Sequence, residues 1–264
     1  NLNNYYTGLF PFGDGSSNNL SYTVALSRNN TFTNPIFPLG GSEFVLSARF
    51  SLPYSLWNGV DYANLGDLEK FQDDDGNPDP AKIEQEKFKW LEFYKIKFKG
   101  SWYTRLFDKL VLRTHTEFGF LGAFNNDRGV IPFDRFFLGG DGMSQYAMDG
   151  RETISLRGYP NQSLSSQDGS TIYNRFSLEL RYPITLKPAA SIFGLTFMET
   201  GQGYNNFREF NPFNGKRSVG LGLRIFMPAF GLLGIDYGYG LDSVNEFNLE
   251  PNGWETHFVI GQQF

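Results

Sequence analysis

One arginine in this sequence lies where a fixed positive charge could be used. Arg157 stands between Leu156 and Gly158, inside a glycine-rich stretch that runs from Phe136 to Tyr159. A guanidinium keeps its proton in proteins, so a buried Arg157 would require carboxylate partners. The segments on either side of this stretch look like strands, and we expect the stretch to fold back among them. An exposed loop arginine is the alternative.

Other residues that could carry chemistry form weaker patterns. Asp73-Asp74-Asp75, with Asp79, could hold Ca²⁺, but the full twelve-residue loop with a terminal bidentate glutamate is absent, which favours a solvated surface loop for 73–79. His115 and His257 are too few and too far apart to indicate a metal site. The sequence has no G-x-S-x-G, P-loop or H-E-x-x-H motif, and no convincing Ser–His–acid set. We therefore predict a protein that is not an enzyme and that uses no metal and no other cofactor.

Composition narrows the class of protein. The 264 residues fit one large domain, aromatic residues reach 17%, and cysteine is absent. Mean hydropathy is nevertheless negative, at -0.36, which indicates alternation of aromatic and polar residues, as in a transmembrane barrel with a lipid face and a polar lumen. The sequence contains no apolar run of about 18 residues or more, which is the length that a transmembrane helix requires. The net charge of -5 disfavours nucleic acid as a partner.

Apolar and polar residues alternate through most of the chain, and the pattern is most regular at 88–102. There Phe88, Trp90, Tyr94 and Ile96 share one parity, whereas Lys95, Lys97 and Lys99 share the other and should face the lumen. At 191–200 both parities are apolar, so the pattern does not decide which side faces lipid. We predict about nine strands, near 21–27, 43–52, 88–102, 110–120, 175–182, 191–200, 217–227, 233–241 and 255–264.

The connections between these strands alternate in length. Shorter ones fall at 29–41, 105–109, 183–189 and 228–231, and longer ones at 53–87, 123–172, 201–215 and 242–254. Outer-membrane barrels pair short periplasmic turns with longer outside loops, whereas the loops of a soluble sandwich need not sort by length. The sequence therefore predicts an all-β, transmembrane antiparallel barrel. An odd strand count further suggests that residues 1–264 are the C-terminal portion of a larger barrel, because single-chain bacterial barrels have an even number.

The glycine-rich stretch carries a family resemblance. Phe136-Phe137-Leu138-Gly139-Gly140, followed by Leu156-Arg157-Gly158-Tyr159, resembles the lumen-inserted loop of BamA-type outer-membrane assembly factors. That loop reads aromatic-aromatic-x-Gly-Gly and then a hydrophobe, Arg, Gly and an aromatic; here the halves lie further apart than in the family's most compact form, and Tyr159 replaces the commoner Phe. The resemblance implies that the connection 123–172 enters the lumen and that Glu179 and Glu199 hold Arg157 as a latch. Glu179 has the lumen parity, whereas Glu199 needs Leu195 and Phe197 on its own side or a bulge nearby.

The end of the chain has a second resemblance. Trp254, Phe258, Ile260 and Phe264 share one parity, and the chain stops at the aromatic residue, which resembles the C-terminal β-signal of outer-membrane proteins. Any amphipathic last strand would give the same alternation. Five glycines on two consecutive strands also face one way, leaving room for an inserted loop or helping the sheet to curve: Gly220, Gly222, Gly234, Gly238 and Gly240.

The resemblance implies a function as well as a fold. It implies the central subunit of the outer-membrane protein assembly machinery, which folds and inserts β-barrel proteins through a lateral gate between the first and last strands of a sixteen-stranded barrel. Upstream strands and POTRA domains would then precede this chain. Expected partners are unfolded outer-membrane proteins as substrates, BAM-type accessory lipoproteins, and outer-membrane lipid and lipopolysaccharide in a Gram-negative bacterium. The alternatives are a two-partner secretion or translocation-module barrel of the same superfamily, or a passive porin-like channel.

Overall fold

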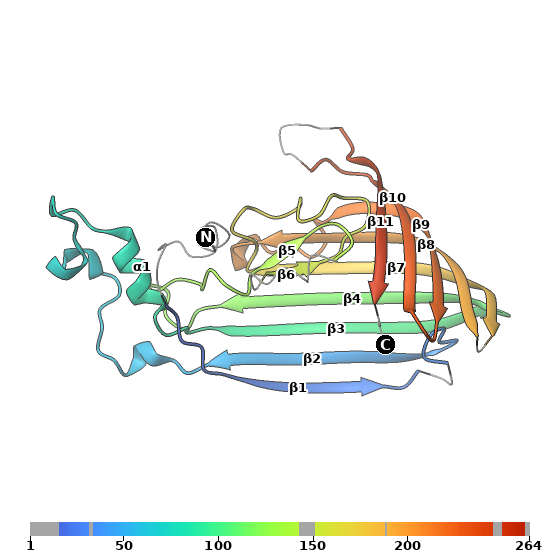
Figure 1. The fold of residues 1–264 in the computed structure, drawn as a ribbon, viewed down its shortest axis with the longest axis horizontal. Helices are drawn as coiled ribbons and strands as arrows, with labels where there is room; N and C mark the ends of the chain where they lie inside the picture. The colour runs from blue at the N-terminus through green and yellow to red at the C-terminus, as the bar shows by residue number, and fades with distance from the viewer. Residues whose placement is uncertain (1–15, 32–33, 143–150, 188, 245–249, 262–264) are drawn as a thin grey trace.

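A nine-stranded antiparallel sheet forms the wall of the molecule (Figure 1). The computed structural model describes residues 16–31, 34–142, 151–187, 189–244 and 250–261. The sheet order is β1-β2-β3-β4-β7-β8-β9-β10-β11, so every strand pairs with its neighbour along the wall. The strands are β1 (Ser21–Asn29), β2 (Gly41–Ser51), β3 (Tyr94–Phe107), β4 (Leu110–Gly122), β7 (Ile172–Lys187), β8 (Ala190–Tyr204), β9 (Lys216–Met227), β10 (Gly231–Gly240) and β11 (Gly253–Gly261).

The all-β fold class is confirmed, and the nine predicted strands correspond one to one with those of the sheet. The sheet bends strongly, so that β1 to β4 run across Figure 1 while β9 to β11 stand nearly upright. It does not close, since neither β1 nor β11 has a second strand neighbour among the described residues. In that same part of the chain, no helix is long and apolar enough to cross a membrane.

The start of the third strand is a correction to the sequence prediction. Residues Pro80–Phe88 form helix α1, and β3 begins only at Tyr94, six residues after Phe88. The Asp79 carboxylate caps this helix by accepting hydrogen bonds from the backbone N–H groups of Ala81 and Lys82, at 2.9 and 3.3 Å. Proline at the first helical position already has the backbone angle of a helix, so Asp79-Pro80 starts a helix locally.

The excursion 52–93 folds into a small unit at one end of the wall. It contains the short helices η1 (Tyr54–Leu56), η2 (Leu65–Asp67) and η3 (Glu69–Phe71), and a core of Tyr62, Leu65 and Phe71. Within its acidic run, the Asp73 carboxylate accepts hydrogen bonds from the backbone N–H groups of Asp75 and Asn77, which closes a turn. The described residues contain no group of three or more side chains placed to hold a metal.

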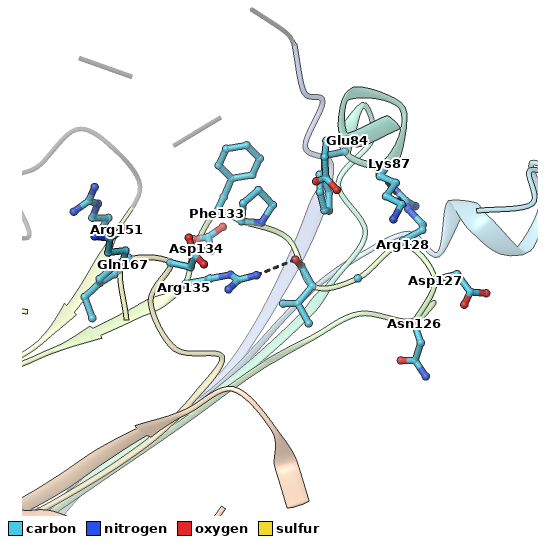
Figure 2. A pocket seen from close by; sticks show the side chains of 16 residues that line it. Glu84, Lys87, Asn126, Asp127, Arg128, Phe133, Asp134, Arg135, Arg151 and Gln167 are labelled. Atoms are coloured by element: carbon cyan, nitrogen blue, oxygen red, sulfur yellow. Dashed lines mark hydrogen bonds between the residues drawn. The ribbon is translucent and has the colours of Figure 1, made fainter. Parts of the chain in front are cut away.

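A cavity of about 610 Å³ separates α1 from the first part of the long connection 123–171 (Figure 2). Arg135 bends back beneath it and donates hydrogen bonds to the carbonyls of Ile131 and Val130, at 3.1 and 3.3 Å. Beside the cavity, buried Arg128 joins the connection to the excursion through the Glu92 carboxylate, 2.5 Å from its Nη1, and the Lys87 carbonyl. Cations and acids alternate around the cavity, so its lining indicates no single ligand charge.

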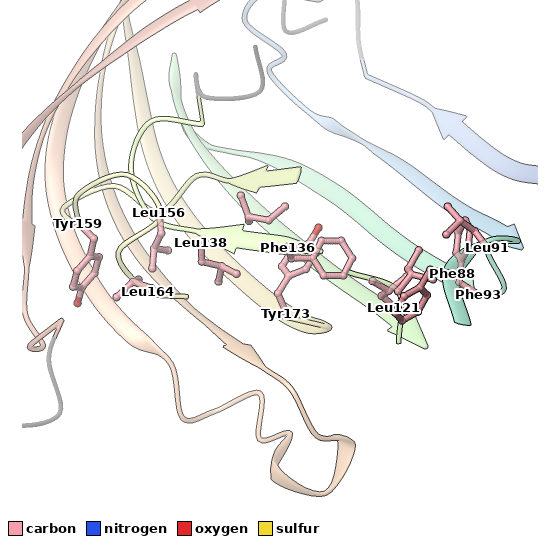
Figure 3. Packing of buried hydrophobic residues seen from close by; sticks show 12 residues of the cluster. Phe88, Leu91, Phe93, Leu121, Phe136, Leu138, Leu156, Tyr159, Leu164 and Tyr173 are labelled. Atoms are coloured by element: carbon pink, nitrogen blue, oxygen red, sulfur yellow. The ribbon is translucent and has the colours of Figure 1, made fainter. Parts of the chain in front are cut away.

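The described parts of the connection 123–171, residues 123–142 and 151–171, lie inside the curve of the wall (Figure 3). The connection forms a parallel two-stranded piece, β5 (Phe136–Leu138) with β6 (Glu152–Ile154). Its apolar side chains and those of the wall make one core, in which the rings of Phe136 and Tyr173 lie 4.6 Å apart. Burial of this apolar surface stabilises the inserted position of the connection. The core contains Phe88, Leu91, Phe93, Leu121, Ile131, Phe136, Leu138, Ile154, Leu156, Tyr159, Leu164 and Tyr173.

A second core lies further along the concave face. It joins the β1–β2 connection, through Phe37, to β3, β4 and β8. Phe193, Leu195 and Phe197 of β8 all belong to it, whereas Met198 is exposed on the opposite face. This settles the facing of β8: its odd positions point inward, including Glu199, without any bulge near that residue. The last short helix, η5 (Phe207–Glu209), follows β8.

Candidate functional site

Arg157 reaches the wall at a cluster of three acids. Only 5% of the residue is exposed. Its Nη2 lies 2.6 Å from Glu199 Oε1 and 2.7 Å from Glu179 Oε1, and its Nη1 lies 3.4 Å from Asp236 Oδ2. The backbone N–H of Arg157 also donates to Glu199 Oε2, at 3.0 Å. These acids come from β7, β8 and β10, so one loop side chain ties three strands together.

Each of these acids has a further cation of its own. Arg175 contacts Glu199 at 2.6 Å, and Arg224 contacts Asp236 at 2.6 Å. Glu179 accepts from Arg181 Nε at 2.8 Å and contacts Arg113 at 3.4 Å. Buried carboxylates are tolerated when they are paired and hydrogen-bonded in this way. The inward face of the wall is therefore a connected ion network, and Arg157 is the member of it that comes from the loop.

An aromatic ring completes the arginine site. The guanidinium carbon of Arg157 lies 3.7 Å from the centre of the Phe197 ring, close enough for a cation–π contact. Phe197 is buried two positions before Glu199 on the same inward face of β8. The ring closes one side of the guanidinium plane while the acids surround its edge.

Gly158 and Tyr159 carry the contact to the last strands. The Gly158 N–H donates to His257 Nε2 at 2.8 Å, and its carbonyl accepts from Asn252 Nδ2 at 2.9 Å. The Tyr159 hydroxyl donates to the Arg217 carbonyl at 2.6 Å, and burial raises the pKa of this hydroxyl to about 12. The loop tip is thus tied to β9 and to β11 on either side of β10.

Glycines on the wall make this approach possible. A Cβ placed on Gly238 would lie 2.8 Å from the Gly158 nitrogen, and one on Gly240 would lie 2.5 Å from the Gly158 oxygen. Gly158 itself has φ of 85°, a conformation that other residues adopt at a cost. Gly238 and Gly240 therefore leave room for the inserted loop.

The two halves of the loop motif meet in space. Gly140 and Leu156 exchange backbone hydrogen bonds, at 3.2 and 3.1 Å. Gly139 has φ of 117° and packs so closely that a Cβ would lie 2.5 Å from the Pro160 oxygen. Phe136 is fully buried in the core behind this bridge. Residues 139–140 and 156–159, far apart in sequence, form one compact unit.

A second attachment holds the same loop to β2 and β3. Lys95 Nζ lies 2.7 Å from Glu152 Oε2, donates to the Asp134 carbonyl at 2.6 Å, and sits 4.6 Å above the centre of the Phe136 ring. Lys97 contacts Glu152 at 2.9 Å, and Arg49 contacts Asp134 at 3.4 Å. Of the three lysines that the alternation predicted to face inward, Lys95 and Lys97 therefore bind acids of the loop, whereas Lys99 pairs with Glu117 of β4 at 3.4 Å.

The last strand presents the predicted side chains outward. Trp254, Phe258 and Ile260 are exposed on the convex face of β11, and Trp254 stacks on Tyr237 with ring centres 4.4 Å apart. Phe264 lies outside the described residues. The role of this strand as a β-signal stays a prediction.

The sequence analysis missed six participants in the network: Asp236, Arg113, Arg175, Arg181, Arg224 and His257. All six have the inward parity of their strands, which was a usable signal. Alternation could not predict which cation pairs with which acid, because these pairs depend on the register between neighbouring strands.

The structure also brings together a Ser–His–acid set that the sequence did not reveal. Ser101 Oγ lies 2.8 Å from His115 Nδ1, and His115 Nε2 lies 2.7 Å from Glu117 Oε1. Arg113 points an N–H at both Ser101 and His115, and Arg175 neutralises Glu117 at 3.0 Å. Ser101 is buried. It lines neither the cavity shown in Figure 2 nor a second, smaller cavity beside Trp57. This set shares Arg113 and Arg175 with the ion network of the wall.

Comparison with known proteins agrees with this architecture. The chain is similar to BamA from Haemophilus ducreyi, in a crystal structure lacking POTRA domains 1-3, with a TM-score of 0.59 and 19% sequence identity. The match covers 90% of this chain and 41% of that chain, so the present chain spans less than half of that protein. No curated protein sequence matches significantly. A family model, described as the Omp85 superfamily domain, matches residues 3–264 of this chain. The chain therefore belongs to the Omp85 superfamily.

Proposed function

We propose that this chain is part of the central barrel of an outer-membrane assembly machinery, which folds and inserts β-barrel proteins through a lateral gate. The chain is part of an outer-membrane β-barrel of the Omp85 type. The observation that carries the proposal is the loop arginine, Arg157, held inside the wall by Glu179 and Glu199. A latch of this kind stiffens the wall from inside while the sheet edges stay available.

The proposed mechanism needs no catalytic residue. An exposed strand edge carries unpaired backbone N–H and C=O groups, and an incoming strand can satisfy them by β-augmentation. In the proposed gate β11 is such an edge, and among the described residues its strand partner is β10. The loop tip contacts this gate strand directly through Gly158 and His257, so the latch and the gate lie next to each other.

The wider assembly follows from the same proposal. Residues 1–264 would be the C-terminal part of a sixteen-stranded barrel, with upstream strands and POTRA domains completing it. Unfolded outer-membrane proteins would be the substrates, and accessory lipoproteins, membrane lipid and lipopolysaccharide would be the partners.

The runners-up make different predictions. A two-partner secretion or translocation-module barrel of the same superfamily would use the same loop, and substrate release outside the membrane would distinguish it. A porin-like channel fits less well, because the concave face is occupied by the loop and its core. Planar bilayers separate this alternative: a wide, steady conductance would favour the porin, and a flickering one the plugged barrel.

Crosslinking during assembly tests the gate. We would place a photoreactive amino acid at Phe258 on β11 of the full-length protein in liposomes and add an unfolded outer-membrane protein. Leu221 on β9 is the matched control, because it is also exposed on the convex face but lies in the middle of the paired wall. We expect crosslinks to the substrate at Phe258 and far fewer at Leu221. Equal crosslinking at both sites, or none at Phe258 while the substrate inserts normally, would contradict the proposal.

A further inference from the structure

The connection between β8 and β9 folds onto the outer face of the wall. The Tyr204 hydroxyl, at the end of β8, donates to the Asn211 carbonyl at 2.5 Å. The Phe210 ring packs edge-on against Tyr204 and against Phe120 of β4, with ring centres 5.5 and 5.6 Å apart. Phe120 points away from the inserted loop, because a Cβ on its neighbour Gly119 would touch Tyr173 and Phe136 inside. The connection 205–215 therefore leans toward the convex side.

Two further phenylalanines of this connection project from the surface. Phe213 is 94% exposed and Phe207 is 70% exposed. The Phe207 ring lies 6.1 Å from both Phe120 and Phe210, so these three rings form one outward-facing group. Phe213 projects from the same connection three residues after Phe210. Large exposed apolar groups of this kind mark interaction surfaces, and single exposed residues do not. We call Phe207, Phe210 and Phe213 the aromatic paddle.

The backbone holds the paddle in a defined shape. The Asn206 side chain caps the short helix η5 by accepting from the Arg208 N–H at 3.0 Å, and the Asn211 side chain accepts from the Phe213 N–H at 3.1 Å. Both asparagines turn the chain so that the rings protrude, while Arg208 and Glu209 between them remain exposed. Rings beside charged groups match the boundary between acyl chains and headgroups, where aromatic residues of membrane proteins collect.

We propose that the aromatic paddle inserts into the lipid leaflet that surrounds this end of the barrel. Its occupant is lipid because the paddle continues an existing lipid-facing surface: Phe120 lies on the same outer face as the Phe118–Phe176 pair, whose ring centres are 5.4 Å apart. A rigid ring group at the rim would fix the depth of β8 and β9 in the membrane. This inference rests on the outer-membrane location of the barrel and not on the assembly function.

A depth measurement tests the paddle without removing it. The 264-residue sequence has no cysteine, so a spin label at Asn214→Cys, beside Phe213, reports on the loop once any cysteine elsewhere in the full-length protein is replaced. In phosphatidylcholine liposomes without substrate, oxygen and a nickel chelate relax labels in lipid and in water respectively. Asp74→Cys in the exposed acidic turn is the water reference, and Leu221→Cys on the convex face is the lipid reference.

The expected result is a label at position 214 that is several-fold less accessible to the nickel chelate than at position 74, with oxygen access near that at position 221. The double substitution Phe207→Ser and Phe213→Ser should return the label to the accessibility seen at position 74. Unchanged heat-modifiable gel migration of this variant would show that the barrel remains folded. Nickel access equal to that at position 74 with the rings present would overturn the proposal. Low access to both reagents, which indicates burial against protein, would overturn it as well.

Discussion

The inserted loop is attached to the wall at two places, and the loop supplies the cation at one of them and the acids at the other. At the inner attachment the loop supplies a cation, Arg157, and the wall supplies acids from β7, β8 and β10. At the outer attachment the loop supplies the acids Asp134 and Glu152, and β2 and β3 supply the cations. A loop with both signs of charge can fit this wall in only one direction, because turning it around would place like charges together.

The two attachments also differ in burial. The Arg157 side chain is 6% exposed and its acid partners are 4% exposed or less, whereas Asp134 and Glu152 remain 24% and 22% exposed. Removing one partner of a fully buried ion pair is costly, and water screens partly exposed pairs. We therefore expect the inner attachment to dominate the stability of the loop and the outer attachment to adjust its position.

The largest effect is expected at the inner attachment. Arg157→Ala should lower the free energy of unfolding by about 3 kcal/mol, the lower end for a broken buried pair, because each acid keeps a second cation. Urea unfolding in lipid and the temperature of heat-modifiable gel migration would measure it.

Arg217→Ala is the matched control for this substitution. The Arg217 side chain is 64% exposed and pairs with Asp242 at 2.8 Å, so water screens this pair and its loss should leave stability nearly unchanged. If the two substitutions lower stability equally, the inner attachment does not dominate.

The inner attachment was the more predictable of the two from sequence. Alternation placed Glu179 on the inward side because a wall between lipid and lumen must sort its residues by parity. Alternation could not predict which side of the wall Glu199 faces. Phe193, Leu195 and Phe197 share its parity and are apolar because they pack inside the wall, in a second core. Only one side of the outer attachment could be predicted. The lysines have the inward parity of their strand, but Asp134 and Glu152 lie in a loop whose residues do not alternate regularly between apolar and polar.

The helix α1 was missed for a different reason. Period-two alternation was extended back to Phe88, although Asp79-Pro80 is a local signal for the start of a helix. Pairings such as Arg224 with Asp236 were beyond any single-sequence pattern, because the register of β9 on β10 sets them. Local chemistry and periodicity thus predicted the wall, and contacts between segments determined the network.

A charge swap at the outer attachment sharpens the contrast. Lys95→Glu alone should cost about 2 kcal/mol, because it sets a buried carboxylate against Glu152 and Asp134. Adding Glu152→Lys should recover about half of this loss by restoring an opposite-charge pair. The equivalent swap of Arg157 with Glu199 should not recover, because each exchanged residue would meet like charges from Asp236, Glu179 and Arg175. Thermal unfolding of the parent, of the four single variants Lys95→Glu, Glu152→Lys, Arg157→Glu and Glu199→Arg, and of the two double variants checks this prediction. Rescue by both double variants would remove the distinction.

The smallest effect is a dependence of the outer attachment on pH. Burial would raise the pKa of Glu152, but the charges of Lys95 and Lys97 outweigh it and hold this pKa below the ordinary 4.5. A carboxyl whose pKa is lower in the folded state stabilises that state above its unfolded pKa, and the contribution is lost as the pH falls through the folded value. Hydrogen exchange of residues 151–156, corrected for intrinsic rates, should therefore show protection that decreases below about pH 4.5.

Glu152→Gln separates this titration from general acid unfolding. The variant cannot gain a proton at position 152, so its protection should be lower at neutral pH and should fall less on acidification. The amides of β8, on the side of Arg157, should keep their protection over the same range, because each acid there is buried against Arg157 and a second cation, which favour its ionised form. Identical pH profiles for the parent and the variant would show that Glu152 does not control the outer attachment. The position of the loop would then depend on its apolar core, with Phe136 and Tyr173 at its centre.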